Sequence, residues 1–184
     1  MSKSVIAYTL EHCVRCMKCL HACPTGAISM QDNRIHVDKT DCINCGRCVR
    51  ACHSKGMVSQ GSTLEDIQNY EYTVCIVPTA VLSRCNSKED VQELFYAIKM
   101  LGFDEVVEHT DIDAQLVKEA LLISESAKEF NFIESFCPVV NELISKKYSI
   151  LGENVLQLQY PSEICAKQIR KRLSGKKVGI FNLC

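Results

Sequence analysis

The pattern of apolar positions is most regular in the last two-thirds of the chain. The run "YTVCIVPTAV" is apolar and β-rich without alternation, which is typical of a strand buried on both faces of a parallel sheet. The next segment repeats apolar residues at helical spacing between Ser87, a favoured helix N-cap, and Gly102, a favoured helix end. The same succession of strand and helix patterns continues to the end of the sequence. It predicts strands at 72–81, 104–109, 131–136 and 177–184 and helices at 87–102, 111–130, 138–148 and 162–173. A short strand at 155–159 is left open. Strands alternating with helices predict an α/β domain with a mainly parallel sheet.

The first part of the chain carries only short elements. The stretch "GAISMQDNRIHVDKTD" predicts a hairpin whose turn lies at Asp32–Asn33. The polar stretch "SQGSTLEDIQNYEY" predicts a linker or a short connecting helix. We therefore predict a small α+β module at 1–60, a linker at 61–72 and the α/β domain at 73–184.

The cysteines are distributed unevenly between these parts. Eight of the 13 lie between Cys13 and Cys52. The chain has a formal charge of −1, no apolar run long enough to span a membrane and no apolar segment near its start that resembles a secretory signal. We therefore expect a cytoplasmic protein without nucleic-acid or membrane partners, in which dense cysteine indicates metal or redox chemistry rather than disulfides.

Two runs, "CVRCMKCLHAC" and "CINCGRCVRAC", share the spacing C-x2-C-x2-C-x3-C. In this motif three cysteines bind one [4Fe-4S] cluster, and the fourth binds the neighbouring cluster. The predicted ligand sets are Cys13, Cys16, Cys19 and Cys52 for one cluster, and Cys42, Cys45, Cys48 and Cys23 for the other. Structural zinc favours two separated cysteine pairs, so it fits less well. The nearby histidines are expected to be surface residues; they are His12, His21, His36 and His53.

Residues 5–60 closely resemble bacterial two-cluster ferredoxins on the strength of these two runs, although His53 stands where that family often has proline. Residues 73–184 resemble the first lobe of the catalytic domain of iron-only ([FeFe]) hydrogenases. The resemblance rests on "TVCIVPTAV", "AIKMLGFDEVVEHTDIDAQL", "SFCPVVNELI" and "VGIFNLC". It implies that Cys137 and Cys184 are ligands of a third [4Fe-4S] cluster, the cubane half of the catalytic cluster.

The chain departs from that family at the catalytic centre. Phe136 replaces a cysteine that donates protons to the diiron site, and Val140 replaces a tryptophan. The sequence printed stops at Cys184, so the two further cluster cysteines of the family are missing. We therefore expect either a piece of a longer hydrogenase-like protein or a domain that has lost the catalytic cluster. No catalytic residue is assigned, and whether the chain is an enzyme stays open.

These observations predict an electron relay. Two [4Fe-4S] clusters would pass electrons to or from the hydrogenase-like domain, with a redox protein or the missing second lobe as partner. The alternative is a non-catalytic redox sensor or electron carrier whose α/β lobe is a docking scaffold. A basic stretch between Lys167 and Lys177 is expected to be a solvated face. Cys75 and Cys165 are expected to be core residues, and Cys85 to have no role in cluster binding.

Overall fold

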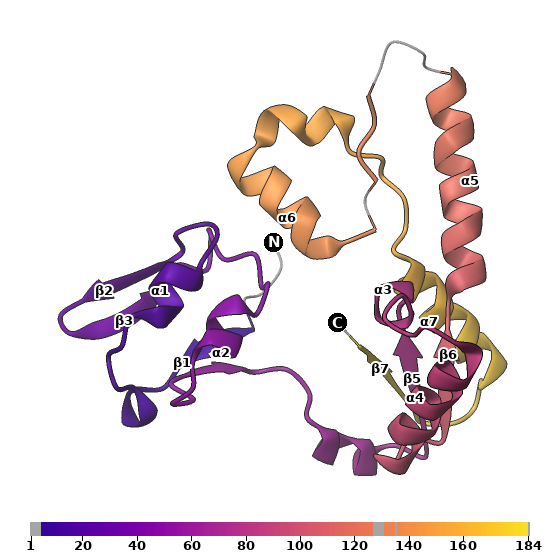
Figure 1. Cartoon of the computed structure of the whole chain (residues 1–184), viewed down its shortest axis with the longest axis horizontal. Coiled ribbons are helices and arrows are strands. Elements are labelled where there is room, and N and C mark those ends of the chain that lie inside the picture. Colours follow the sequence, from indigo (N-terminus) through magenta and orange to yellow (C-terminus); the bar gives the residue numbers. More distant parts are fainter. Residues whose placement is uncertain (1–4, 127–130, 135, 184) are drawn as a thin grey trace. The chain divides into compact units, whose positions relative to one another are not determined.

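A computed structural model describes residues 5–126, 131–134 and 136–183 (Figure 1). The chain forms two compact units. The first comprises Met1–Gly61 and Cys137–Glu153, and the second comprises Ser62–Phe136 and Asn154–Cys184. The sequence predicts that residues 137–153 belong to the second domain, whereas the structure groups them with the first unit. No helix of the described residues is long and apolar enough to cross a membrane.

The first unit contains two small antiparallel sheets. Strand β1 (Ile6–Tyr8) pairs with β4 (Met57–Ser59), and β2 (Ile28–Gln31) pairs with β3 (Arg34–Val37). The predicted hairpin is confirmed, because its turn is made by Asp32 and Asn33. Their φ angles of 46° and 62° are the left-handed values that the tightest hairpin turns require.

The helices of this part are short. A 3-10 turn, η1 (Leu10–His12), precedes α1 (Lys18–Ala22), and α2 (Arg47–Ala51) occupies the same place in the second cysteine run. The small buried core contains two cysteines: its members are Ile6, Cys19, Ile28, Ile35, Cys48 and Met57. A core of this size stabilises a module only marginally, so we expect bound clusters to supply much of its folding free energy.

The first unit also contains α6 (Pro138–Lys147) and most of the 3-10 segment η3 (Ser149–Asn154). Helix α6 begins with proline at its first position, where the missing amide hydrogen costs nothing. Cys137 is its N-cap residue. The two lysines that end the helix contact the start of the second cysteine run: Lys146 contacts Cys42, and Lys147 contacts Asp41, the residue before it.

The second unit is built on a three-stranded parallel sheet, as the sequence predicts. Its order is β6 (Glu105–Glu108), β5 (Tyr72–Val77), β7 (Val178–Asn182), with β5 in the centre. Together with the small antiparallel sheets of the first unit, it makes the whole chain a mixed α/β protein.

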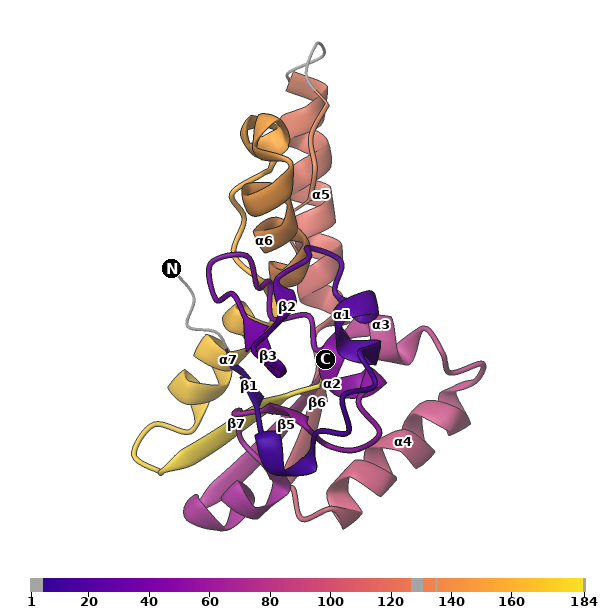
Figure 2. The same cartoon turned by 90° about the vertical axis from the view of Figure 1, so that its left-hand side faces the viewer.

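Both faces of β5 are buried, which explains its unbroken apolar run. Val74 and Ile76 pack on one side against Cys165 and Ile169 of α7 (Pro161–Arg172). On the other side, the face that carries Cys75 and Val77 packs against a cluster that includes Ile98 of α4 (Lys88–Met100). Figure 2 shows α4 and α7 on opposite sides of the strands. The expectation that Cys75 and Cys165 are core residues is therefore confirmed.

Three further helical elements complete the second unit. They are η2 (Leu64–Asn69), α3 (Thr79–Leu82) and α5 (Thr110–Ser126). The element η2 lies in the segment expected to be a linker or short helix, and the Asp66 carboxylate accepts a hydrogen bond from the Thr63 amide there (2.6 Å). The predicted N-cap of α4 is confirmed, because the Ser87 hydroxyl accepts a hydrogen bond from the Asp90 amide (3.1 Å).

Two strand predictions need correction, and the short strand left open at 155–159 does not form. The strand predicted at 72–81 ends at Val77, because Pro78 has no amide hydrogen for the sheet and precedes α3. No strand forms in the described residues of 131–136 or at 155–159. A single parallel bridge between Ile133 and Val155 joins these two segments instead. Both segments mix apolar with polar residues, and in the described part of the chain neither has a second strand beside it to extend the pairing.

Candidate iron-sulfur centres

The two cysteine runs fold in the same way. In each run, the residues two and four positions after the first cysteine have positive φ angles. These residues are Arg15 (57°) and Met17 (59°) in the first run, and Asn44 (54°) and Gly46 (69°) in the second. A left-handed conformation costs a non-glycine residue about 1–2 kcal/mol, so the surrounding structure must hold these residues in it, as is common at functional sites. Alternating turns of this kind point successive amide N–H groups inward and form the concavities found at many iron-sulfur sites.

The last two cysteines of each run are placed by a short helix. Cys19 and Cys48 lie at the second position of α1 and α2 and are buried. Cys23 and Cys52 are the C-cap residues of the same helices. Each helix therefore carries the third cysteine of its run near its start and the fourth just past its end. This separation is what ligands shared between two sites require.

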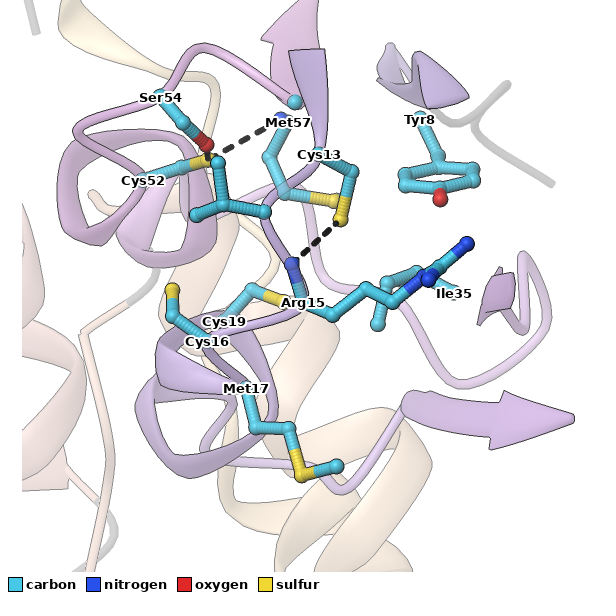
Figure 3. A pocket seen from close by; sticks show the side chains of 12 residues that line it. Tyr8, Cys13, Arg15, Cys16, Met17, Cys19, Ile35, Cys52, Ser54 and Met57 are labelled. Carbon is cyan, nitrogen blue, oxygen red and sulfur yellow. Dashed lines mark hydrogen bonds between the residues drawn. The ribbon is translucent and has the colours of Figure 1, made fainter. Parts of the chain in front are cut away.

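A pocket in the first unit brings cysteines of both runs together. Figure 3 shows its lining, which includes Cys13, Cys16 and Cys19 of the first run and Cys52 of the second. Apolar side chains complete most of its wall, among them Met57 and Ile35. The pocket thus contains the four cysteines predicted to hold one cluster. The assignment of ligands to both clusters remains a prediction.

Hydrogen-bond donors surround the sulfur atoms. The Arg15 amide lies 3.4 Å from the Cys13 Sγ, and the Met57 amide lies 3.4 Å from the Cys52 Sγ. The fourth cysteine of each run also has a hydroxyl two residues later. The Thr25 Oγ1 lies 3.5 Å from the Cys23 Sγ, and the Ser54 Oγ lies 3.6 Å from the Cys52 Sγ. Donors of this kind stabilise negative charge on sulfur and help to set cluster potentials.

The thiols respond to these surroundings in two ways. Burial raises the pKa of Cys48 to about 11, and burial also raises the pKa of Cys19. Burial opposes ionisation of Cys23 and Cys52 as well. There the neighbouring hydroxyl and the backbone amides outweigh it, so the pKa of each thiol is lowered. Deprotonation is therefore easier at the capping cysteines than at the buried helix cysteines.

The residues of the pocket fit a [4Fe-4S] cluster. Thiolates are the ligands that such clusters use, one for each iron, so the ligands surround a volume rather than converge on a single ion. Among the described residues, no three His, Cys, Asp or Glu side chains lie close enough together to hold a single metal ion. Within the same part of the chain, the buried Tyr8 hydroxyl has no hydrogen-bond partner. Burial and the adjacent Cys13 raise the pKa of Tyr8, so this hydroxyl keeps its proton near a predicted ligand.

Gly56 packs closely against Cys13, and no local pattern in the sequence indicates this contact. An added Cβ at Gly56 would lie 3.1 Å from the Cys13 Cα and 3.2 Å from its Cβ. The Gly56 carbonyl also accepts a hydrogen bond from the Thr9 amide (2.8 Å), which limits how far the backbone can move. Any side chain at this position must therefore displace Cys13.

We expect Gly56→Ala to weaken cluster binding at this pocket, because Cys13 is pushed from its place. The measurement is the rate at which a chelator bleaches the cluster absorbance of the reconstituted chain, which should increase several-fold. Gly152→Ala is the matched control, since nothing lies within 4 Å of its added Cβ. Equal bleaching rates for the two variants would contradict the prediction.

The other candidate residues lie elsewhere. Cys137 is exposed at the start of α6, while Cys184 lies outside the described residues, so their pairing in a third cluster stays a prediction. Cys85 is partly buried. The four histidines near the runs are exposed, as expected: His12, His21, His36 and His53. The sequence does not indicate a role for Tyr8, Gly56 or Lys146, because only the folded chain brings them close to the cysteines.

Two comparisons with protein families agree with this geometry. Residues 12–58 match the family model of the 4Fe-4S dicluster domain. Residues 71–181 match the model of the iron only hydrogenase large subunit, C-terminal domain. A search of curated proteins finds no significant match. The two matched domains give the protein an iron-sulfur redox or electron-transfer role. The second match covers more than half of the chain, and the protein therefore belongs to the family of the iron only hydrogenase large subunit, C-terminal domain.

Proposed function

We propose that this chain is an electron relay in which two [4Fe-4S] clusters pass electrons to or from the hydrogenase-family domain. The first cluster is held by Cys13, Cys16, Cys19 and Cys52, and the second by Cys42, Cys45, Cys48 and Cys23. The observation that carries the proposal is the pocket lined by three cysteines of the first run and the last cysteine of the second. Because each run lends one ligand to the other, the two clusters lie close together and form a single path.

When bound, the clusters supply one-electron transfer; the protein binds them, shields them and sets their potentials. The buried positions of Cys19 and Cys48 would limit the access of water to the iron atoms that these two cysteines bind. Donors such as the Arg15 and Met57 amides stabilise the negative charge that increases on reduction. The chain thus favours electron transfer over ligand exchange at iron.

The hydrogenase-family domain is proposed as the other end of the relay. Cys137 and Cys184 are the candidates for ligands of a third cluster in a longer parent protein. Phe136 cannot exchange protons, so this chain is not assigned hydrogen chemistry of its own. The partner is either a redox protein or a second hydrogenase lobe that supplies the remaining ligands.

Iron and sulfide analysis tests the proposal directly. After anaerobic reconstitution we expect about eight irons and eight sulfides per chain, because each [4Fe-4S] cluster contributes four of each. The EPR spectrum of the reduced protein should show two interacting clusters. A value of about four irons would overturn the two-cluster assignment. A value near twelve would add a third cluster at Cys137 and Cys184, with ligands from outside the chain.

A further inference from the structure

The end of α6 is attached to the second cysteine run inside the first unit. The Lys146 Nζ donates a hydrogen bond to the backbone carbonyl oxygen of Cys42, at 2.7 Å. The same ammonium forms an ion pair with the Glu142 Oε2, at 2.8 Å. One residue later, the Lys147 Nζ lies 3.0 Å from the Asp41 Oδ2. Two lysines in succession therefore hold the helix on the loop that begins the second run.

The two lysines differ in how strongly water screens them. The Lys146 side chain is 21% exposed and its partner Glu142 is 32% exposed. Lys147 and Asp41 are 33% and 43% exposed. An ion pair near solvent contributes little and is weakened by salt, whereas a partly buried charge acts on its neighbours more strongly. Lys146 is thus the charge that matters for whatever Cys42 binds.

We propose that Lys146 is a positioning residue that holds α6 on the Cys42 loop and raises the reduction potential of the second cluster. The inference rests on the proposed two-cluster function. Reduction adds one electron to the cluster, so a nearby ammonium stabilises the reduced state more than the oxidised state. The Glu142 carboxylate opposes this effect. The pair therefore sets the potential through the balance of two opposite charges next to one ligand.

Lys146 comes from the part of the sequence that matches the hydrogenase family, yet it contacts a predicted cluster ligand, Cys42. Helix α6 follows Cys137 directly, and it lies within the residues that match the hydrogenase-family model. The potential of a cluster in the ferredoxin-like module is thus adjusted by a side chain from the hydrogenase-family part of the sequence. Any change that lifts α6 from the Cys42 loop lowers that potential and alters which direction of electron transfer is favoured.

An EPR-monitored redox titration of the reconstituted full-length chain tests the proposal. Lys146→Met should shift one of the two midpoint potentials to a more negative value, because it removes a positive charge and keeps the negative charge of Glu142. Glu142→Gln should shift the same potential in the opposite direction. Lys146→Arg keeps the charge and the donor, so it should restore most of the wild-type value. A purely structural role for Lys146 does not produce shifts of opposite sign.

Two controls locate the effect. Lys147→Met removes a charge of the same sign from a more exposed pair, so its shift should be smaller and should vanish at high salt. Tyr8→Phe removes the hydroxyl beside Cys13, so it should move the other midpoint potential. If both potentials stay fixed in Lys146→Met with about eight irons bound, the inference fails while the relay stands. If only about four irons bind to the wild-type chain, the proposed function fails and the inference with it.

Discussion

Replacing Cys16 with serine is expected to reduce the iron content of the reconstituted chain from about eight atoms to about four. Cys16 is exposed, so the substitution removes little packing and acts through the lost thiolate. The remaining cluster should be the one assigned to Cys42, Cys45 and Cys48. Its EPR signal should lose the splitting that comes from a neighbouring paramagnetic cluster. Iron analysis and EPR of the dithionite-reduced variant measure both effects.

The same substitution should destabilise the whole module. The buried core of this module is small, and Cys19, a ligand of the lost cluster, belongs to it. Losing a cluster therefore removes binding free energy that the apolar residues do not replace. Hydrogen exchange of the β1 and β4 amides should become faster. Cys85→Ser is the control, since Cys85 lies outside both runs and is expected to leave the iron content unchanged.

Serine substitutions of the fourth cysteines test the crossed pairing. Because Cys52 lines the pocket of the first run, Cys52→Ser should abolish the same cluster as Cys16→Ser. Cys23→Ser should abolish the other cluster. If Cys52→Ser instead spared the cluster of Cys13, Cys16 and Cys19, each run would hold its own cluster with all four of its cysteines. The crossed relay would then be wrong.

The parts of the molecule that the sequence predicts well are those fixed by neighbours in the chain. The hairpin turn at Asp32–Asn33 and the N-cap at Ser87 depend on residues within four positions. A continuous apolar run predicts the β5 strand, because both faces of this strand are buried. The cysteine spacing is likewise a local property, and it identifies the cluster motif without any knowledge of the fold.

The parts that the sequence predicts poorly depend on contacts between distant residues. Gly56 looks like a turn residue until Cys13 is found against it. Lys146 follows Cys42 by 104 positions, so no local pattern joins them. The stretch at 131–136 resembles a strand, but strand formation needs a partner edge, and only one bridge forms among its described residues. Its described side chains are exposed or half-buried, so its apolar residues predict neither a strand nor burial.

The second large effect is expected in the other unit, from replacement of Ile76 with alanine. Ile76 lies at the centre of the parallel sheet and is 1% exposed. Its side chain belongs to the cluster formed with Cys165 and Ile169 of α7. The substitution should lower the free energy of unfolding of this unit by about 2–5 kcal/mol, since it removes buried methyl groups and leaves a cavity. Ile76→Val, which removes a single methylene, should cost only about 0.5–1.5 kcal/mol.

Hydrogen exchange resolved along the chain measures this effect in each unit separately. The amides of β5, β6 and β7 should exchange faster in Ile76→Ala, by a factor that grows exponentially with the lost free energy. The iron content should not change, because the buried core around Cys19 and Cys48 contains only residues of the first unit. Loss of iron in Ile76→Ala would show that the two units unfold together. Retention of iron beside a destabilised sheet would mean that the cluster module folds and binds its clusters independently of the hydrogenase-family domain.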